Sequence, residues 1–420
     1  MLQSMFNGVS AILSNQKGMD VIGNNIANVS TTGFKAGAVS FADQLSETLQ
    51  SATTATTGLG GKNAMQVGHG VRVGSIDIRT GEGGLSATSV PTDLAIQGNG
   101  YFMIANSSGA ASYSRDGHFA VDGAGNLVSA NTGERVLGWA ADTSGVVDTT
   151  KTVDGSSALS VPVGSLTAAS ATKSTTYVGN LDSGSAAGAT VKSDVTVYDS
   201  LGTKHNVTLN LTRDTDPVTG AAANTWSWTA SGDSSLAAAT GTTNTGKVTF
   251  DTNGQVSTVT GSIVMNPPGA TSPQTIALNL GTLTQLSGAS SLTNKSQDGF
   301  PLGTLQSFSI DGNGVINGVF SNGLSRKLGQ IALATFSNPA GLQRVGNNEF
   351  ALTTNSGDAT VGTANSQGLG SIQAGYLEQS NVDLSVELTN MIVSQRAYQA
   401  NTKIVTTVDQ MLNELINMKQ

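Results

Sequence analysis

The sequence predicts a multidomain protein whose terminal α-helices pair as a coiled coil and whose middle domains are β-rich and mainly antiparallel. Apolar residues recur every seven positions at both ends of the chain, which is the spacing of paired helices. Between the ends, glycine-punctuated stretches alternate apolar and polar residues as half-buried strands do. The 420 residues are enough for two or three domains.

Residues 1–30 are expected to form one amphipathic helix. Its glycines at 8, 18 and 23 each weaken an isolated helix by about 1 kcal/mol relative to alanine, so the helix needs a partner. The apolar stripe consists of Met5, Ile12, Met19 and Ile26 at seven-residue spacing, with Leu2, Val9 and Ile22 beside them.

Residues 381–420 contain neither glycine nor proline and predict a longer helix. Ser380 with Asp383 offers a capping box at its start, and Asn381 is a second candidate cap. The stripe consists of Leu384, Met391, Tyr398, Val405 and Leu412, flanked by Leu388, Ala397, Ile404, Val408, Met411, Leu415 and Ile416. The two helices could pack on each other within one molecule, antiparallel or parallel, or also on neighbouring copies; spacing alone favours the first arrangement.

The middle of the chain contains a repeat. Residues 119–128 match residues 308–317 around an Asp-Gly-x-Gly turn, and 251–254 are a shorter relative. Such turns between apolar residues predict β-hairpins. Because the two long copies flank a Thr/Ser/Ala-rich stretch, they suggest one domain split by an insertion. We therefore expect a helical domain (1–30 and 381–420), an extended linker region (31–72 and 374–380), a discontinuous β domain (73–149 and 291–373) and an inserted outer β domain (150–290).

The composition argues against several classes of partner. Charged residues make up 11% of the chain, against roughly 25% in an average globular domain. The net charge is −8 without any basic run, so no nucleic-acid partner is expected. The first twenty residues lack the pattern of a Sec-type signal, and no stretch approaches the ~18–20 apolar residues of a membrane span.

The sequence predicts no catalytic, cofactor-binding or metal-binding residues. The histidines at 69, 118 and 205 lie on different segments without metal-ligand spacing, and there is no nucleophile elbow. Most aspartates lie in D-G or D-x-x-G turns, where the carboxylate bonds its own backbone. The Asp251 and Asp311 turns lack the glutamate of a calcium loop, and the Gly98-Asn-Gly100 segment leads into a strand rather than a helix.

Three segments are more specific than any of these patterns. The first is Asn24-Asn25-Ile-Ala-Asn28-Val-Ser-Thr-Thr-Gly33-Phe34-Lys; the second is Asp93-Leu-Ala-Ile-Gln-Gly98-Asn-Gly100-Tyr-Phe, continuing to Tyr113-Ser-Arg-Asp-Gly117; the third is Gly375-Tyr-Leu-Glu-Gln-Ser-Asn381-Val-Asp-Leu384, continuing through Gln395-Arg-Ala-Tyr-Gln-Ala-Asn401. Together they resemble the flagellar rod and hook proteins of bacteria over the full length of the chain. Shorter members of that family form the rod, whereas Val195–Gly202 looks like part of the insertion domain of the hook subunits. Residues 140–190 and 215–245 match nothing in the family pattern.

The resemblance implies a non-enzymatic structural subunit of the hook, a curved and flexible tube that passes torque from the motor and rod to the filament. It implies paired terminal helices around a central channel, β domains further out, and export by the flagellar type III apparatus to an extracellular position. The implied partners are further copies of the chain, the rod, a hook cap and hook–filament junction proteins. Near the helix exit, Asn24, Asn25 and Asn28 would fix the register, hold a turn or simply cap the helix.

Two alternatives remain at this point. One is a distal-rod subunit with an unusual insertion. The other is a secreted β-rich enzyme or glycan-binding adhesin, which would need convergent carboxylates or stacked aromatic rings. Trp226 and Trp228 would share one face of a strand, but core packing explains them more simply.

Overall fold

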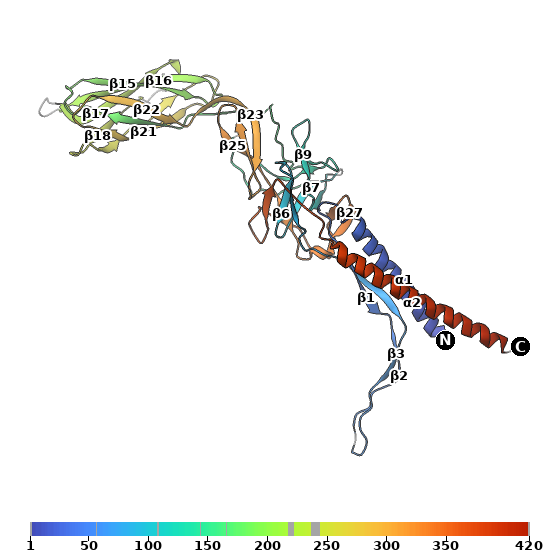
Figure 1. Ribbon diagram of the computed structural model, residues 1–420. Helices are drawn as coiled ribbons and strands as arrows, with labels where there is room; N and C mark the ends of the chain where they lie inside the picture. The colour runs from blue at the N-terminus through green and yellow to red at the C-terminus, as the bar shows by residue number, and fades with distance from the viewer. Residues whose placement is uncertain are drawn as a thin grey trace. The chain divides into compact units, whose positions relative to one another are not determined.

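The computed structural model describes residues 2–418 apart from 56, 107–108, 143, 165, 217–221 and 237–243. A long helix lies near each end of the chain and strands occupy the middle (Figure 1), which confirms the predicted fold class. The chain divides into two compact units. The first comprises Met1–Val161, Ser309–Asn317 and Lys327–Gln420, and the second comprises Pro162–Phe308 and Gly318–Arg326.

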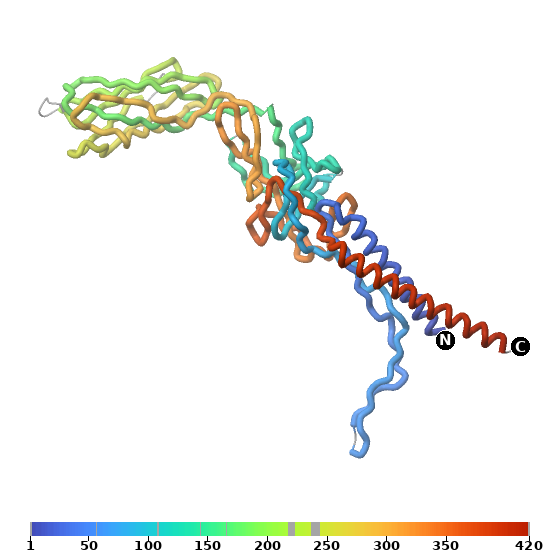
Figure 2. The backbone as a smooth tube through the Cα atoms, viewed as in Figure 1, coloured from blue at the N-terminus to red at the C-terminus, as the bar shows by residue number. Residues whose placement is uncertain are grey.

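Helices α1 (Leu2–Ala27) and α2 (Leu384–Asn417) lie side by side and antiparallel, so both chain ends lie at the same end of the pair (Figure 2). The register explains this direction: Gly8 of α1 faces Val405 late in α2, whereas Gly18 shares a groove with Glu387 at the start of α2. The packing therefore decides between the two directions that the sequence left open.

The predicted start of α2 was wrong. The N-cap is Asp383, whose carboxylate accepts hydrogen bonds from the backbone amides of Ser385 and Val386 at 2.9 and 3.2 Å. Ser380 and Asn381 lie before the helix. Asp383 is the N-cap because its carboxylate accepts hydrogen bonds from two first-turn amides that have no partner within the helix.

Two antiparallel strand pairs form a β ribbon in residues 37–50 and 65–78, most of which fall in the stretch expected to be a linker (31–72). Strand β1 (Gly37–Asp43) pairs antiparallel with β4 (Val71–Ile78), and β2 (Ser46–Gln50) pairs with β3 (Met65–Gly68) further out. The β1–β4 part packs on α1, since Ser14 Oγ donates to Val71 O at 3.3 Å. The β2–β3 part is exposed along both strands.

The β part of the first unit is built around one sheet of nine strands. Seven run in the order β27-β28-β8-β7-β11-β10-β9, and β26 pairs with both β7 and β29. Two small sheets, β30-β6 and β31-β5, lie before the terminal helix. The strands are β5 (Leu85–Ala87), β6 (Leu94–Gln97), β7 (Tyr101–Ala105), β8 (Ala111–Ser114), β9 (Phe119–Val121), β10 (Leu127–Ser129), β11 (Arg135–Val136), β26 (Leu333–Thr335), β27 (Gln343–Gly346), β28 (Glu349–Ala351), β29 (Thr360–Gly362), β30 (Ser371–Ala374) and β31 (Tyr376–Glu378).

Aromatic rings hold this part together. Phe336 packs edge-on against Tyr113 with ring centroids 4.8 Å apart, and Tyr101 lies 5.7 Å from Phe350 in the same cluster. Each ring pair contributes about 0.5–1.5 kcal/mol beyond its burial. Burial raises the pKa of the Tyr101 and Tyr113 hydroxyls.

A further five-stranded sheet has the order β12-β25-β24-β23-β13. Its strands are β12 (Gly138–Ala140), β13 (Thr167–Ser170), β23 (Phe300–Ile310), β24 (Val315–Phe320) and β25 (Ser325–Ile331). Strands β23, β24 and β25 each contribute residues to both compact units, so the chain passes between the units along them.

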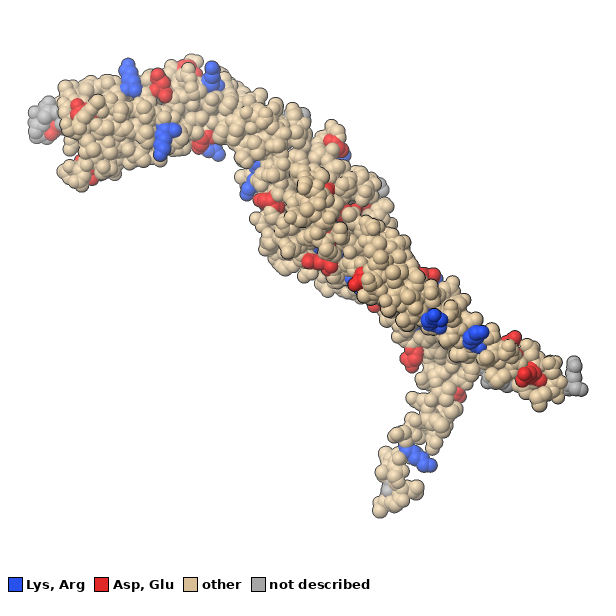
Figure 3. All heavy atoms as spheres, in the orientation of Figure 1, with Lys and Arg blue, Asp and Glu red and all other residues tan. Residues whose placement is uncertain are grey.

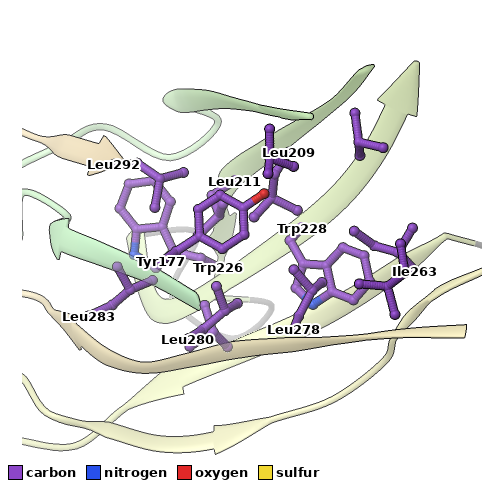
Figure 4. Close-up of a cluster of buried hydrophobic side chains, with 14 of the residues drawn as sticks. Tyr177, Leu209, Leu211, Trp226, Trp228, Ile263, Leu278, Leu280, Leu283 and Leu292 are labelled. Atoms are coloured by element: carbon purple, nitrogen blue, oxygen red, sulfur yellow. The ribbon is translucent and has the colours of Figure 1, made fainter. Parts of the chain in front are cut away.

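The second unit contains two sheets with a shared core (Figure 4). Their orders are β20-β21-β14-β22 and β15-β16-β17-β18-β19, and β14 pairs in parallel with β21. The strands are β14 (Ser174–Asn180), β15 (Thr190–Tyr198), β16 (Lys204–Thr215), β17 (Ala222–Gly232), β18 (Thr245–Phe250), β19 (Val256–Val259), β20 (Ile263–Met265), β21 (Gln274–Thr284) and β22 (Ser291–Gln297). A short 3-10 turn lies at Ser234–Leu236 in this unit. A second 3-10 turn, at Pro339–Gly341, belongs to the first unit.

Trp226 and Trp228 are both fully buried on one face of β17, as predicted, and lie beside Tyr177 in this core (Figure 4). The unit differs from the expected 150–290 at both ends. At the first end, residues before Pro162 belong to the first unit, where Val161 N donates a hydrogen bond to Gly125 O. At the other end, β22 (Ser291–Gln297) lies beyond residue 290 but pairs with β14 inside the second unit.

The repeated turns are β-hairpins, as predicted. In the turns at Asp122, Asp251 and Asp311, and in a further one at Asp199, the carboxylate accepts from the amides two and four residues on. Each turn closes on a glycine with positive φ, for example 76° at Gly314, where a side chain would be strained.

The strands that follow the two long repeat copies pair with each other. In β12 and β25, Gly138 lies opposite Ile331 and Ala140 lies opposite Gly329. Added methyls at Gly138 and Gly329 would both lie 2.8 Å from Leu159. The glycines of β12 and β25 therefore make room for one fully buried leucine.

Candidate self-assembly site

Small residues on α1 bring the two helices together. A methyl added at Gly8 would lie 3.1 Å from Val405 Cγ2, and one at Gly18 would lie 3.4 Å from Phe41 Cζ. Gly8, Ser14, Gly18 and Asn25 are the buried positions of α1. The glycines that weaken α1 in isolation therefore allow its close packing on α2 and on the ribbon.

The predicted stripe residues divide into covered and uncovered sets. Met5, Ile12, Met19, Ile22 and Ile26 are half-buried on α1, and Met391, Val405 and Leu412 are half-buried on α2 beside the buried Val408. Val9, Leu384, Leu388, Tyr398 and Leu415 are exposed. The helix pair therefore satisfies one side of each stripe and leaves the other in solvent.

Each helix also carries an exposed apolar face that the sequence analysis did not resolve. The outer α1 face consists of Leu2, Phe6, Val9 and Leu13 at spacings of four, three and four residues. The outer α2 face consists of Val386, Val393, Ile404, Met411 and Leu415. Phe6 and Val393, at 63% and 62%, are the most exposed side chains of the two faces.

The spacing of apolar residues along each helix indicates these faces. A single seven-residue stripe per helix does not include most of their residues. Both helices are apolar over a wider arc than one partner helix covers. Figure 3 shows that charged side chains are scattered singly over the visible surface, so large areas are neutral.

The three sequence segments of the family resemblance converge on a buried ion cluster. Lys35 Nζ lies 2.5 Å from Glu378 Oε1 and donates to Gly81 O at 2.9 Å. Arg115 Nη1 lies 3.2 Å from Glu378 Oε2. All three side chains are nearly or fully buried. Burial holds the pKa of Lys35 below its usual value, although the charge of Glu378 opposes this shift.

Other residues of the same three segments hold the backbone around this cluster. Gly33 has a φ of 66°, and an added methyl would lie 2.5 Å from Asp116 N. Phe34 is buried under the Arg344 guanidinium, 5.0 Å from the ring centre. Asn381 Oδ1 accepts from Ala36 N at 2.7 Å, and its amide donates to Arg79 O and Gly81 O.

The other signature asparagines and glycines are also structural. Asn25 makes a pair of 2.8 Å hydrogen bonds with the amide and carbonyl of Gly37, which fixes the chain where it leaves α1. Asn28 donates to Asn24 O at 2.9 Å. Gly98 and Gly100 have φ values of 107° and 134°, and Gly98 approaches Gly370 closely.

The three histidines lie apart, each beside a carboxylate. His205 is buried between Asp233 (2.6 Å) and Asp199 (3.3 Å), His118 lies 2.8 Å from Asp93, and His69 lies 3.6 Å from Glu47. Within the described residues, no three His, Cys, Asp or Glu side chains are grouped to hold a metal ion. No helix among them is long and apolar enough to span a bilayer.

Comparison with known families defines the class of protein. Residues 5–35 match the flagella basal body rod protein family, and residues 373–418 match the C-terminal region of the flagellar basal body rod FlgEFG proteins. Residues 95–169 match the D1 domain of flagellar hook protein FlgE/F/G, and residues 165–300 match the FlaE D2 domain. Paired terminal helices, a β domain and an inserted β domain are thus those of a flagellar rod-and-hook subunit.

Full-length relatives narrow this class. The flagellar hook protein FlgE of Borreliella burgdorferi is 37% identical over all of both chains, as is that of Treponema pallidum. FlgE of Salmonella typhimurium is 35% identical over 99% of this chain and all of its own. The chain belongs to the flagellar hook protein family and is a structural subunit of the hook. These full-length relatives support the hook subunit rather than the rod alternative.

Proposed function

We propose that copies of the chain polymerise through the outer α1 and α2 faces into an extracellular, curved and flexible tube that passes torque from the rod to the filament. The exposed apolar side chains along both helices carry this proposal. Nine half-exposed side chains of this kind represent on the order of 10 kcal/mol of burial. Association costs ~4–15 kcal/mol in lost translational and rotational freedom. Burial of the two outer faces is therefore large enough to offset a cost of that order.

The difference between the two faces supports an open polymer rather than a closed dimer. The outer α1 face and the outer α2 face have different residues, so a contact between them uses a different surface on each copy. Head-to-tail contacts whose rotation does not close generate helical filaments.

The outer surface of the second unit supports flexibility. Outward-facing positions on β15 and β16 carry short polar side chains, such as Thr196, Asn206 and Thr212. Contacts between such surfaces are individually weak and replaceable, so neighbouring copies can slide while the helices stay bound. This is what a tube needs if it bends as it rotates.

The remaining parts of the proposal follow the family. We include the rod, a hook cap and hook–filament junction proteins as partners, and export through the flagellar type III apparatus. The proposed assembly residues are the uncovered stripe residues together with the two outer faces.

Deletion of residues 384–420 tests the proposal. This variant retains Asn381 and its hydrogen bonds, so the β units should fold, as tryptophan fluorescence would report. We expect a soluble monomer that forms no tubes under conditions where the full chain does, seen by negative-stain electron microscopy. A full-length Gln395→Ala variant is the control and should assemble. Normal tubes from the deletion variant would refute the proposal.

A further inference from the structure

A groove lies between α1, α2 and β1 in the first unit. Its volume is about 250 Å³, and its apolar lining includes Val21, Ile22, Phe41 and Val393. Phe41 and Val393 at its rim are 49% and 62% exposed. Because an apolar cavity of about 150 Å³ is large enough to bind benzene, the groove has room for an aromatic ring.

Two charged groups make the groove suitable for an aromatic ring. Glu387 is 3% exposed, and its carboxylate lies 3.7 Å from the half-exposed Arg79 guanidinium. A guanidinium attracts the negative face of an aromatic ring, and a carboxylate attracts its positive edge. A ring seated over the half-exposed face of the Arg79 guanidinium would meet the first preference, and its edge could face the neighbouring Glu387 carboxylate.

Phe6 is the complementary group. At 63% it is the most exposed aromatic side chain among the described residues, and it lies in the middle of the outer α1 face. It does not reach the groove of its own copy. Phe6 precedes Val21 and Ile22 by fifteen or sixteen residues on one straight helix, which places it about 23 Å away along the axis.

We propose that Phe6 of one copy inserts into the groove of a second copy, displaced by about 20 Å along the helix pair. This inference rests on the proposed function, because a second copy lies beside the first only if the chain polymerises. Each copy then offers one Phe6 and one groove at different heights. The contact therefore leaves a free Phe6 and a free groove at the two ends of any stack, which is the requirement for continued growth.

Disulfide trapping tests the pairing, since the chain has no cysteine of its own. The variant Phe6→Cys/Val393→Cys is assembled into tubes and oxidised. An intrachain disulfide is excluded because the Cα atoms of a disulfide lie within about 7 Å. We expect a ladder of covalent oligomers on a denaturing gel. The matched control is Phe6→Cys/Gln395→Cys, with the second cysteine at the same height on the opposite side of α2, and it should remain monomeric.

The outcomes separate this inference from the proposed function. Tubes without a 6–393 ladder, or with an equal ladder in the control, overturn the pairing and leave polymerisation intact. If the cysteine variants do not assemble, a reconstruction of wild-type tubes decides: Phe6 beside Val393 of another copy supports the inference, and Phe6 elsewhere overturns it. Absence of tubes from the wild-type chain would instead refute the proposed function.

Discussion

Glu378 joins distant parts of the chain within the first unit. Its side chain is fully buried between those of Lys35 and Arg115, which lie 343 and 263 positions earlier in the chain. Removing one partner from a buried ion cluster leaves uncompensated charge and costs about 3–5 kcal/mol.

We therefore expect Glu378→Gln to accelerate hydrogen exchange strongly in β6, β7 and β31. Lys17→Met is the control, since Lys17 and its partner Asp20 are 67% and 57% exposed and such pairs contribute at most about 1 kcal/mol. Equal exchange in the two variants would mean that the cluster contributes nothing.

His205 gives the second unit a pH dependence. Burial lowers the pKa of His205, but hydrogen bonds and charges from Asp233 and Asp199 outweigh it and raise the pKa overall. A group whose pKa is raised on folding stabilises the fold below its unfolded value, about 6.5, and loses this contribution as pH rises through the folded value.

The free energy of unfolding of the second unit should thus fall above about pH 6.5, by at most about 1.4 kcal/mol per pH unit. Urea titrations in a Trp139→Phe background would measure this, because Trp226 and Trp228 then report on the second unit alone. His205→Gln should flatten the dependence. If the free energy of unfolding of His205→Gln fell with pH as steeply as that of the parent protein, His205 would not be the source of the pH dependence.

At the scale of single residues, hydrogen bonds between near neighbours in the sequence could be predicted, whereas contacts between distant residues could not. The turn at Asp311 was predictable because its carboxylate bonds amides two and four residues away. The cluster at Glu378 joins residues 343 and 263 positions apart, and no local pattern encodes that distance. The family resemblance marked these residues without giving their role.

The two helices show the same division at the scale of elements. Their existence and seven-residue periodicity were predicted, whereas their direction, the Asp383 cap and the outer faces were not. Those features depend on which arc of each helix the partner covers. That is set by Gly8 and Gly18, which have no side chain to count in a periodicity.

Glycines at two positions of α1 should respond oppositely to substitution. An added methyl at Gly23 meets nothing within 4 Å, so Gly23→Ala should stabilise the helix by about 1 kcal/mol. Gly8→Leu must push against Val405 and should separate α1 from α2. Helical circular dichroism during thermal unfolding would measure both effects. The helix contact would be wrong if both variants were stabilised.

At the scale of the whole molecule, the second unit is an insertion within the sequence of the first. The strands that follow the two repeat copies, β12 and β25, pair with each other, and the second unit lies between them in the sequence. The expected boundaries at 150 and 290 differ from the structural ones. Composition changes there, but strand pairing, which the composition does not report, decides which unit a residue joins.

The central claim is that the outer faces are exposed in the monomer and buried in the tube. The most direct test is the maleimide labelling rate of a single cysteine at position 404, where Ile404 is 44% exposed in one copy. We predict that polymerisation slows labelling at least about 10-fold, as burial of an apolar contact should, while a cysteine at Thr196 is unaffected. Equal labelling rates at position 404 in monomer and tube would contradict the account.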